Sequence, residues 1–254
     1  MRRQPCDDGS SPVSAHESGQ ALALFVVAQE YGVQRNGAQL CTVTLDGTTL
    51  TAVCQRDVDL TFAQVLGLAQ TTVTARASAS FAAVRAPANV APTAIRHFNF
   101  IKGLEYTIWD DVKDEDPASG DISGAYRGWL NLDCEFPMSC GVGGTSDLAE
   151  WMRNGYPGLI EADSWMRGSD GTNTGALHAA SVGQLLIIPV YDTIEQKYPG
   201  RDYYHIISFA AFRSTEIIDQ TARMGLRGHF EAVVIPGDPG GLVDGGLRTV
   251  RMTR

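Results

Sequence analysis

The stretch LCTVTLDGTTLTAVCQ, residues 40–55, decides how the first half of the chain folds. Apolar and polar residues alternate from Cys41 to Leu45, and the alternation returns from Leu50 to Cys54. A period of two is typical of a strand with one buried face, and two such runs joined by a turn predict a β-hairpin. The threonines then take the opposite face of the hairpin.

Two registers are open to this hairpin. If Leu45 pairs with Leu50 across a longer loop, Cys41 directly faces Cys54, whereas a tight turn centred on Asp46-Gly47 sets Cys41 against Ala52. Directly opposite Cβ atoms lie about 4.5–5.5 Å apart, which is near disulfide geometry. The cysteines therefore favour the longer loop and a Cys41–Cys54 disulfide. The alternative is two reduced cysteines packed as small apolar residues.

A second disulfide is predicted between Cys134 and Cys140, where Pro137 favours a turn that brings the two together; the alternative is two free thiols in a loop. Only Cys6 of the five cysteines is then left over. Two disulfides predict an oxidising, extracytoplasmic compartment, in the cell envelope or secreted. The chain has no CxxC motif and no paired histidines, so we expect no metal site and no cofactor.

Working outward, Thr61–Ala69 predicts a helical turn or two, and TTVTARASASFAAV, residues 71–84, predicts a long strand of small side chains. The Pro/Ala stretch 86–92 is the predicted domain boundary. The predicted fold class is α+β, mostly β, with an N-terminal hairpin-plus-long-strand unit followed by a β-rich domain with two or three short helices. Its parts are a disordered leader at 1–20, an N-terminal region at 21–86, the β-rich domain at 93–236 and a flexible tail at 237–254.

Within the β-rich domain, the predicted strands begin with an alternating segment at 97–109 and a short strand at 128–132. The run at 184–191 contains Pro189, which indicates an edge strand or a bulge. The nearly continuous apolar run at 203–212 predicts a central strand buried on both faces. A strand at 226–235 closes the sheet. Helices are predicted at 147–154 and 175–182.

Charge and hydropathy limit the partners. The formal net charge is −9 and the pI is about 5.0, which argues against binding to nucleic acid through phosphate contacts. The longest apolar run near the start, Ala21–Ala28, is far shorter than a membrane-spanning helix needs, so we expect no spanning segment.

The acidic stretch from Asp110 to Asp121 predicts a solvated loop rather than a calcium site, because its spacing fits no calcium-binding loop.

Motifs of catalysis are weak. No GxSxG, GxGxxG or Walker sequence occurs, so we expect no enzyme and no catalytic residues. The alternative is a secreted hydrolase with a site in 141–205 that uses His178 or His205 with Asp192. A third interpretation is a ligand-binding module in which the rings of three tryptophans share one exposed face. These tryptophans are Trp129, Trp151 and Trp165.

Several co-linear segments resemble one family. ESGQALALF, residues 17–25, and VDLTFAQVLGLAQTTVTARASASFAAV, residues 58–84, are similar to the opening motif and the following segment of the TadE/TadG-like Flp pilus (tight adherence) assembly proteins. The second half resembles a version of that family in five further segments. These are Gly128–Asp133, Gly143–Gly158, Ile188–Asp192, Tyr203–Phe212 and Arg227–Phe230.

The resemblance implies a structural role in pilus assembly, adhesion or envelope anchoring, with pilus-assembly or envelope proteins as partners. Family members are membrane-anchored, because a full membrane span follows the opening motif. Here the chain passes from ALALF directly to VVAQEYGVQRNGAQ. We therefore expect the anchor to be missing from this chain.

Overall fold

The computed structural model describes residues 40–101, 103–110, 120–122, 127–138, 145–169, 174–220 and 223–253. The predicted leader and the apolar run after it lie outside these residues. The chain divides into two compact units between Ser80 and Phe81. The described part is mostly β with two short α-helices, which confirms the predicted fold class.

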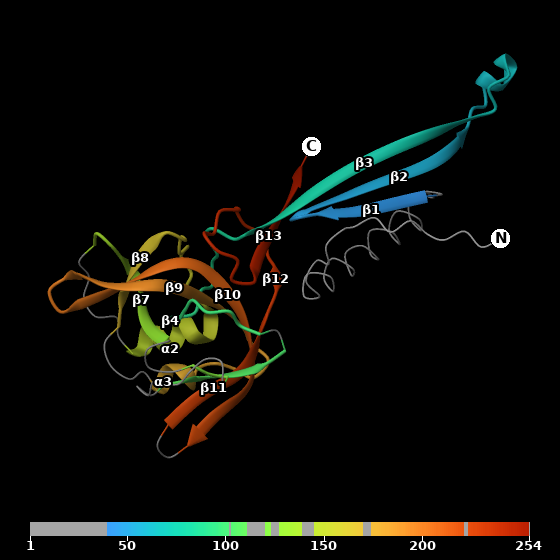
Figure 1. Ribbon diagram of the computed structural model, residues 1–254. Helices are drawn as coiled ribbons and strands as arrows, with labels where there is room; N and C mark the ends of the chain where they lie inside the picture. The colour runs from blue at the N-terminus through green and yellow to red at the C-terminus, as the bar shows by residue number, and fades with distance from the viewer. Residues whose placement is uncertain are drawn as a thin grey trace, which may run out of the picture. The chain divides into compact units, whose positions relative to one another are not determined.

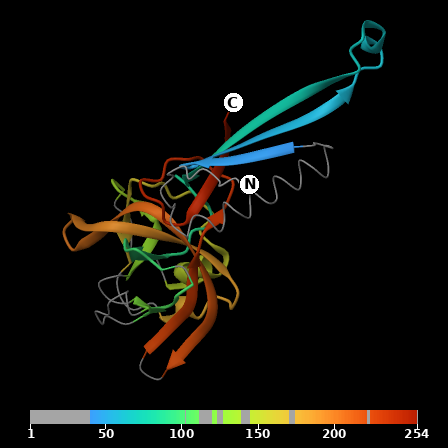
Figure 2. The ribbon, with the colours of Figure 1, turned by 45° about the vertical axis from the view of Figure 1, so that its right-hand side comes forward.

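The first unit is built on the hairpin of residues 40–55. Strand β1 (Leu40–Asp46) pairs antiparallel with β2 (Thr49–Asp59), and β2 pairs along its whole length with β3 (Gln70–Ala83). Beyond Leu40, the first residue of β1, strands β2 and β3 continue as a two-stranded ribbon (Figures 1 and 2). A short 3-10 helix, η1 (Ala63–Leu66), joins them at the tip, where a helical turn or two was predicted.

The second unit holds an eight-stranded sheet in the order β6-β5-β11-β10-β8-β7-β4-β9, and β9 also pairs with β10. Strands β10, β8, β7, β4 and β9 therefore close into a ring. Small closures of this kind fill their interior with side chains, and the main core lies in this unit. The strands of the sheet are β4 (Thr93–Arg96), β5 (Glu105–Trp109), β6 (Asp121–Ile122), β7 (Arg127–Glu135), β8 (Ser164–Gly168), β9 (Leu185–Tyr198), β10 (Arg201–Gln220) and β11 (Arg223–Glu231).

Strand β10 is central, as its apolar sequence predicted. It pairs with β8 and then β11 along one side and with β9 along the other, and Phe209 and Phe212 are buried. Of the edge strand or bulge predicted at Pro189, the bulge is present and the edge is not, because β9 pairs with β10 and also with β4. A register shift does lie beside Pro189, where Val190 and Tyr191 face Ser208 and Ile206.

The two α-helices differ in how well they were predicted. Helix α2 (Thr145–Asn154) buries Leu148 and Met152, and it ends at Gly155, whose φ of +77° is in the left-handed region. Helix α3 (Thr174–Leu177) is shorter than predicted, because the chain leaves the helix before His178.

Three further expectations differ from the structure. Val90 and Ala91 lie in the core of the second unit, where Ala91 N donates to Ile187 O at 2.7 Å, so the 86–92 stretch is not a linker between units. The segment predicted as a flexible tail contains β13 (Leu247–Thr253), which pairs with β12 (Val233–Val234). Asp110 is buried rather than solvated.

The burial of Asp110 has a clear cause. Its carboxylate accepts a hydrogen bond from Trp129 Nε1 at 3.1 Å and lies 3.7 Å from the guanidinium of Arg127. Both charged side chains are almost fully buried, so each requires the other. Trp109 Nε1 donates to Asp121 at 2.5 Å. The two ends of the acidic stretch are therefore anchored through tryptophans, while residues 111–119 lie outside the described residues.

Candidate functional site

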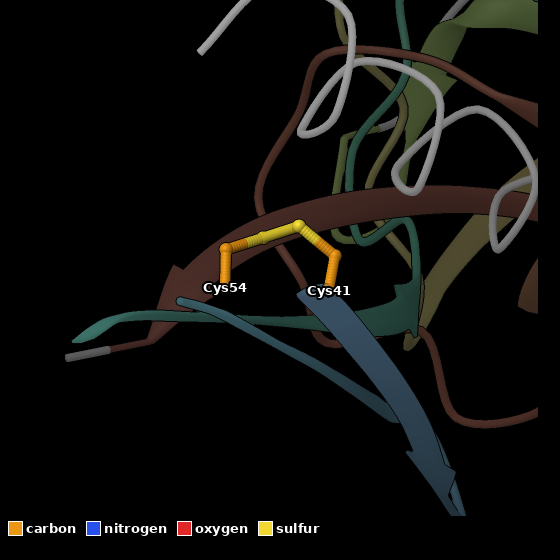
Figure 3. Close-up of a disulfide and its surroundings, with 2 residues drawn as sticks. All are labelled: Cys41 and Cys54. Atoms are coloured by element: carbon orange, nitrogen blue, oxygen red, sulfur yellow. A yellow bond between two sulfur atoms is a disulfide. The ribbon is translucent and has the colours of Figure 1, made fainter. Parts of the chain in front are cut away.

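The disulfide between Cys41 and Cys54 links the two strands of the first hairpin, with Cα atoms 4.1 Å apart (Figure 3). Cys41 faces Cys54, Val43 faces Ala52 and Leu45 faces Leu50, which confirms the predicted register. Val43 is buried on the same face, whereas the threonines at 42 and 44 are exposed. The disulfide therefore fixes the register of the strand that leads into the ribbon.

The second predicted disulfide is not described in full. Cys134 is buried on β7, and a turn with Met138 N donating to Glu135 O at 2.9 Å follows it, as the position of Pro137 predicted. Cys140 and Cys6 lie outside the described residues, so the Cys134–Cys140 pair stays a prediction.

The tip of the β2–β3 ribbon carries the most exposed apolar side chains among the described residues. Phe62 is 92% exposed, Val65 88% and Leu66 81%, and Leu68 beside them is 59% exposed. No formal charge occurs anywhere in Leu60–Ala69. We call Phe62, Val65, Leu66 and Leu68 the apolar tip.

Four backbone N–H groups of the apolar tip donate hydrogen bonds within the turn, those of Leu60, Gln64, Gly67 and Leu68. Leu60 N donates to Ala69 O at 2.9 Å and Leu68 N donates to Ala63 O at 3.1 Å. Gly67, at a φ of +81°, donates to Gln64 O at 3.0 Å and ends η1. The tight turn needs the positive φ that glycine supplies, and it directs the hydrogen bonds inward. The apolar side chains are thus left outside a turn that its own backbone hydrogen bonds hold together.

Two acidic residues stand at the base of the apolar tip. Asp59 accepts a hydrogen bond from Gln70 Nε2 at 2.7 Å, and Asp57 accepts one from Thr72 Oγ1 at 2.6 Å. These cross-strand pairs hold the two strands together next to the turn. They place two negative charges beside the apolar surface, and Arg56 on the same strand places one positive charge there.

A second group of interest surrounds His205 on β10. Its Nδ1 lies 2.9 Å from Asp192 Oδ1 and its Nε2 lies 3.0 Å from Asp163 Oδ1. The side chain of His205 is 17% exposed, whereas those of Asp163 and Asp192 are 73% and 44% exposed. Burial lowers the pKa of His205. The two carboxylates together raise the pKa by more than burial lowers it, so the pKa lies above its usual 6.5.

Local irregularities aim both carboxylates at His205. On β9, the register shifts so that Tyr191 faces Ile206 while Ile194 faces Tyr204, and the extra residue places Asp192 opposite His205. Asp163 has a φ of +70°, which aspartate tolerates better than most residues, and its N–H donates to Ile206 O at 2.7 Å.

Aromatic stacking completes this group. The Trp165 ring stacks on His205 with centroids 4.8 Å apart, and Lys197 Nζ lies 3.6 Å from the centroid of Trp165. Lys197 also pairs with Glu195 at 2.5 Å. The group therefore combines an imidazole, two carboxylates and a cation held on an indole, all on the surface.

The geometry bears on the hydrolase alternative in two ways. Asp192 does lie beside His205, as that alternative requires, but the nitrogen that would take a proton from a nucleophile faces Asp163 instead of a hydroxyl. His178 is exposed beyond the end of α3 and does not join the group. Among the described residues, no cluster of three metal-binding side chains is present.

The three tryptophans do not form a shared exposed face. Trp129 and Trp151 are buried. Trp129 donates a hydrogen bond to Asp110, and Trp151 packs edge-on against Tyr156. Trp165 belongs to the His205 group. Within the described part of the chain, no helix is both long and apolar enough to cross a membrane.

Comparison of the chain with known protein families, curated proteins and solved structures finds no match.

Proposed function

We propose that the protein is a non-catalytic, extracytoplasmic structural protein of the cell envelope that acts in Flp (tight adherence) pilus assembly or surface adhesion. The observation that carries the proposal is the disulfide-fixed hairpin sheet whose ribbon ends in the exposed apolar tip. An exposed apolar surface of this kind is typical of an attachment site. The segment 58–84, which resembles the pilus-assembly family, covers the tip and β3.

The disulfide also supports the proposed compartment, because disulfides persist in oxidising environments. The His205 group fits a structural role, because both ring nitrogens are already engaged by carboxylates. The partners in this proposal are other pilus-assembly or envelope proteins. Pilus ATPase and prepilin genes beside the gene for this chain would be the expected genetic setting.

The proposal is tested by deleting the gene in the organism that encodes it. We expect fewer surface pili by electron microscopy and weaker attachment to a solid surface. Both should return with the wild-type gene, and return less with Cys41→Ser/Cys54→Ser. Deletion that leaves pilus number and attachment unchanged would contradict the proposal.

The second candidate function is the secreted hydrolase. The contact of His205 with Asp192 favours it, since a carboxylate and the imidazole that it orients are two of the three members of a catalytic triad. Turnover of an ester or peptide substrate that depends on His205 would replace the structural proposal with this one.

A further inference from the structure

We propose that the apolar tip of the β2–β3 ribbon inserts into the surface of a lipid bilayer, with a preference for electrically neutral lipid. This goes beyond the proposed function and does not depend on it, because the tip alone carries the argument. Three properties of the tip point to lipid as its binding partner. They are the exposure of its side chains, the hydrogen bonding of its backbone and the charge around it.

Exposure points to a fluid partner. Phe62, Val65 and Leu66 are each more than 80% exposed, so neighbouring residues cover almost none of their side-chain surface. A flat protein surface would cover one side of such a group and leave the rest in water. Acyl chains surround a projecting side chain from all directions without a matched cavity. Removal of this apolar surface from water is the driving force for insertion.

The backbone makes insertion inexpensive. An unsatisfied N–H or C=O group is strongly unfavourable in a bilayer. In the turn, Leu60, Gly67 and Leu68 all donate to carbonyl oxygens of the same turn. The ten residues from Leu60 to Ala69 also carry no formal charge that would have to leave water. These hydrogen bonds can stay intact when the tip enters the interface, and no charged side chain of the tip has to leave water.

Charge selects the kind of lipid. Residues 56–59 at the base of the tip carry Arg56, Asp57 and Asp59, which gives a net charge of −1, and the whole chain has a net charge of −9. Anionic lipid repels these charges, whereas phosphatidylcholine does not. Insertion into a neutral surface is apolar in origin, so it should depend little on salt.

Flotation with phosphatidylcholine vesicles tests the inference on the purified full chain. We expect wild type to float with the vesicles, equally at low and high salt. Phe62→Asp/Leu66→Asp should lower the partition coefficient at least about tenfold, because each change places a charge in the interface. The matched control is Leu159→Asp/Val182→Asp, since these side chains are 66% and 64% exposed elsewhere on the surface. Phosphatidylglycerol in the vesicles should weaken binding at low salt.

A fluorescence reporter tests depth independently of the charge variants. Phe62→Trp should gain a blue-shifted emission that brominated phosphatidylcholine quenches, while Leu159→Trp should not. Urea unfolding checks that each variant is folded.

Three outcomes would overturn the inference. Folded wild type could stay unbound to phosphatidylcholine, or Phe62→Asp/Leu66→Asp could bind as wild type does. The third is self-association in sedimentation that this variant abolishes, without vesicle binding, which would assign the tip to a second copy of the chain. Vesicle binding by purified protein and pilus number on cells are separate measurements, so this inference and the proposed function can fail independently.

Discussion

At the scale of single residues, the charge of His205 links the stability of the fold to pH. Protonated, it donates Nδ1–H to Asp192 and Nε2–H to Asp163. Because the folded pKa lies above the unfolded value of 6.5, the stabilising effect is complete below pH 6.5 and is lost as pH rises through the folded pKa. Lys197 and Glu195 near Trp165 largely offset each other's charge.

We therefore predict that the free energy of unfolding falls by roughly 1 kcal/mol more in wild type than in His205→Gln when the pH is raised from about 6 to about 8.5. The magnitude is modest because both carboxylates are substantially solvated. Urea unfolding at several pH values measures it. The control is His178→Gln, which removes an exposed histidine and should keep the wild-type slope. Equal slopes in wild type and His205→Gln would show that the two carboxylates contribute no net stability.

Of the two carboxylates that contact His205, the sequence analysis identified one and missed the other. Asp192 was weighed as a partner of His178 or His205, and it lies one residue beyond the strand predicted at 184–191. Asp163 was not, since its role depends on a positive φ just before β8, which no local pattern indicates. Asp110 was misplaced for a similar reason. Its charge suggested solvent, but Arg127 and Trp129 meet it only through the long-range packing of the sheet.

At the scale of elements, the disulfide stabilises the hairpin by limiting the unfolded chain. The bridge joins residues 13 apart, and closing a loop of this size contributes about 3 kcal/mol on the chain-entropy estimate. We predict that Cys41→Ser/Cys54→Ser lowers the free energy of unfolding of the first unit by that amount. Hydrogen exchange of the amides of β2 and β3 measures the unit separately from the rest.

Reduction supplies the control for this prediction. A reductant should destabilise wild-type β2 and β3 as much as the double substitution does, and it should leave the exchange of the double variant unchanged. Faster exchange confined to β1 would show instead that the ribbon holds its register without the bridge.

The pairing of β11 with β10 depends on a glycine at position 228, because no side chain fits there. Gly228 on β11 faces Ser214, next to the register shift in β10. A Cβ added at Gly228 would collide with the carbonyl oxygen of Arg213 and lie 2.7 Å from Phe212 Cζ. We predict that Gly228→Ala destabilises the second unit by about 1–3 kcal/mol, as overpacking does. Urea unfolding measures the change. Gly175→Ala is the matched control, because a Cβ there meets nothing within 4 Å. A Gly228→Ala variant as stable as Gly175→Ala would mean that β10 shifts freely.

Elements with strong local patterns were predicted well. The register of the first hairpin followed from the two cysteines and the alternation alone, and β10 followed from its apolar run. Strand β13 was missed because its Gly-rich surroundings suggest a loop, while its partner β12 lies on the other side of that loop. Pro189 indicated an edge strand or a bulge, and only the bulge is present, because pairings that sequence does not reveal hold the strand on both sides.

At the scale of the whole molecule, the division into units runs through β3 rather than through a proline-rich linker. Composition marks flexible linkers, but here the Pro/Ala stretch supplies Val90 and Ala91 to a core. Closure of five strands into a ring likewise arises from the pairing of β4 with β9 and of β9 with β10. Neither pairing has a local signature, so the fold class was predictable and the topology was not.

The last prediction concerns the whole molecule as a catalyst. The His205 group holds a histidine and a carboxylate, which are two of the three members of a catalytic triad. The second carboxylate, that of Asp163, occupies the imidazole nitrogen that would have to take a proton from a nucleophile. We predict no turnover on ester, peptide or glycoside panels, and the same background rate for wild type, His205→Ala and His178→Ala. Asp163→Asn, which weakens the competing contact, should also stay at background. Activity in wild type that His205→Ala removes would refute this prediction. Activity that arises only in Asp163→Asn would show that one carboxylate alone separates this surface from a working base.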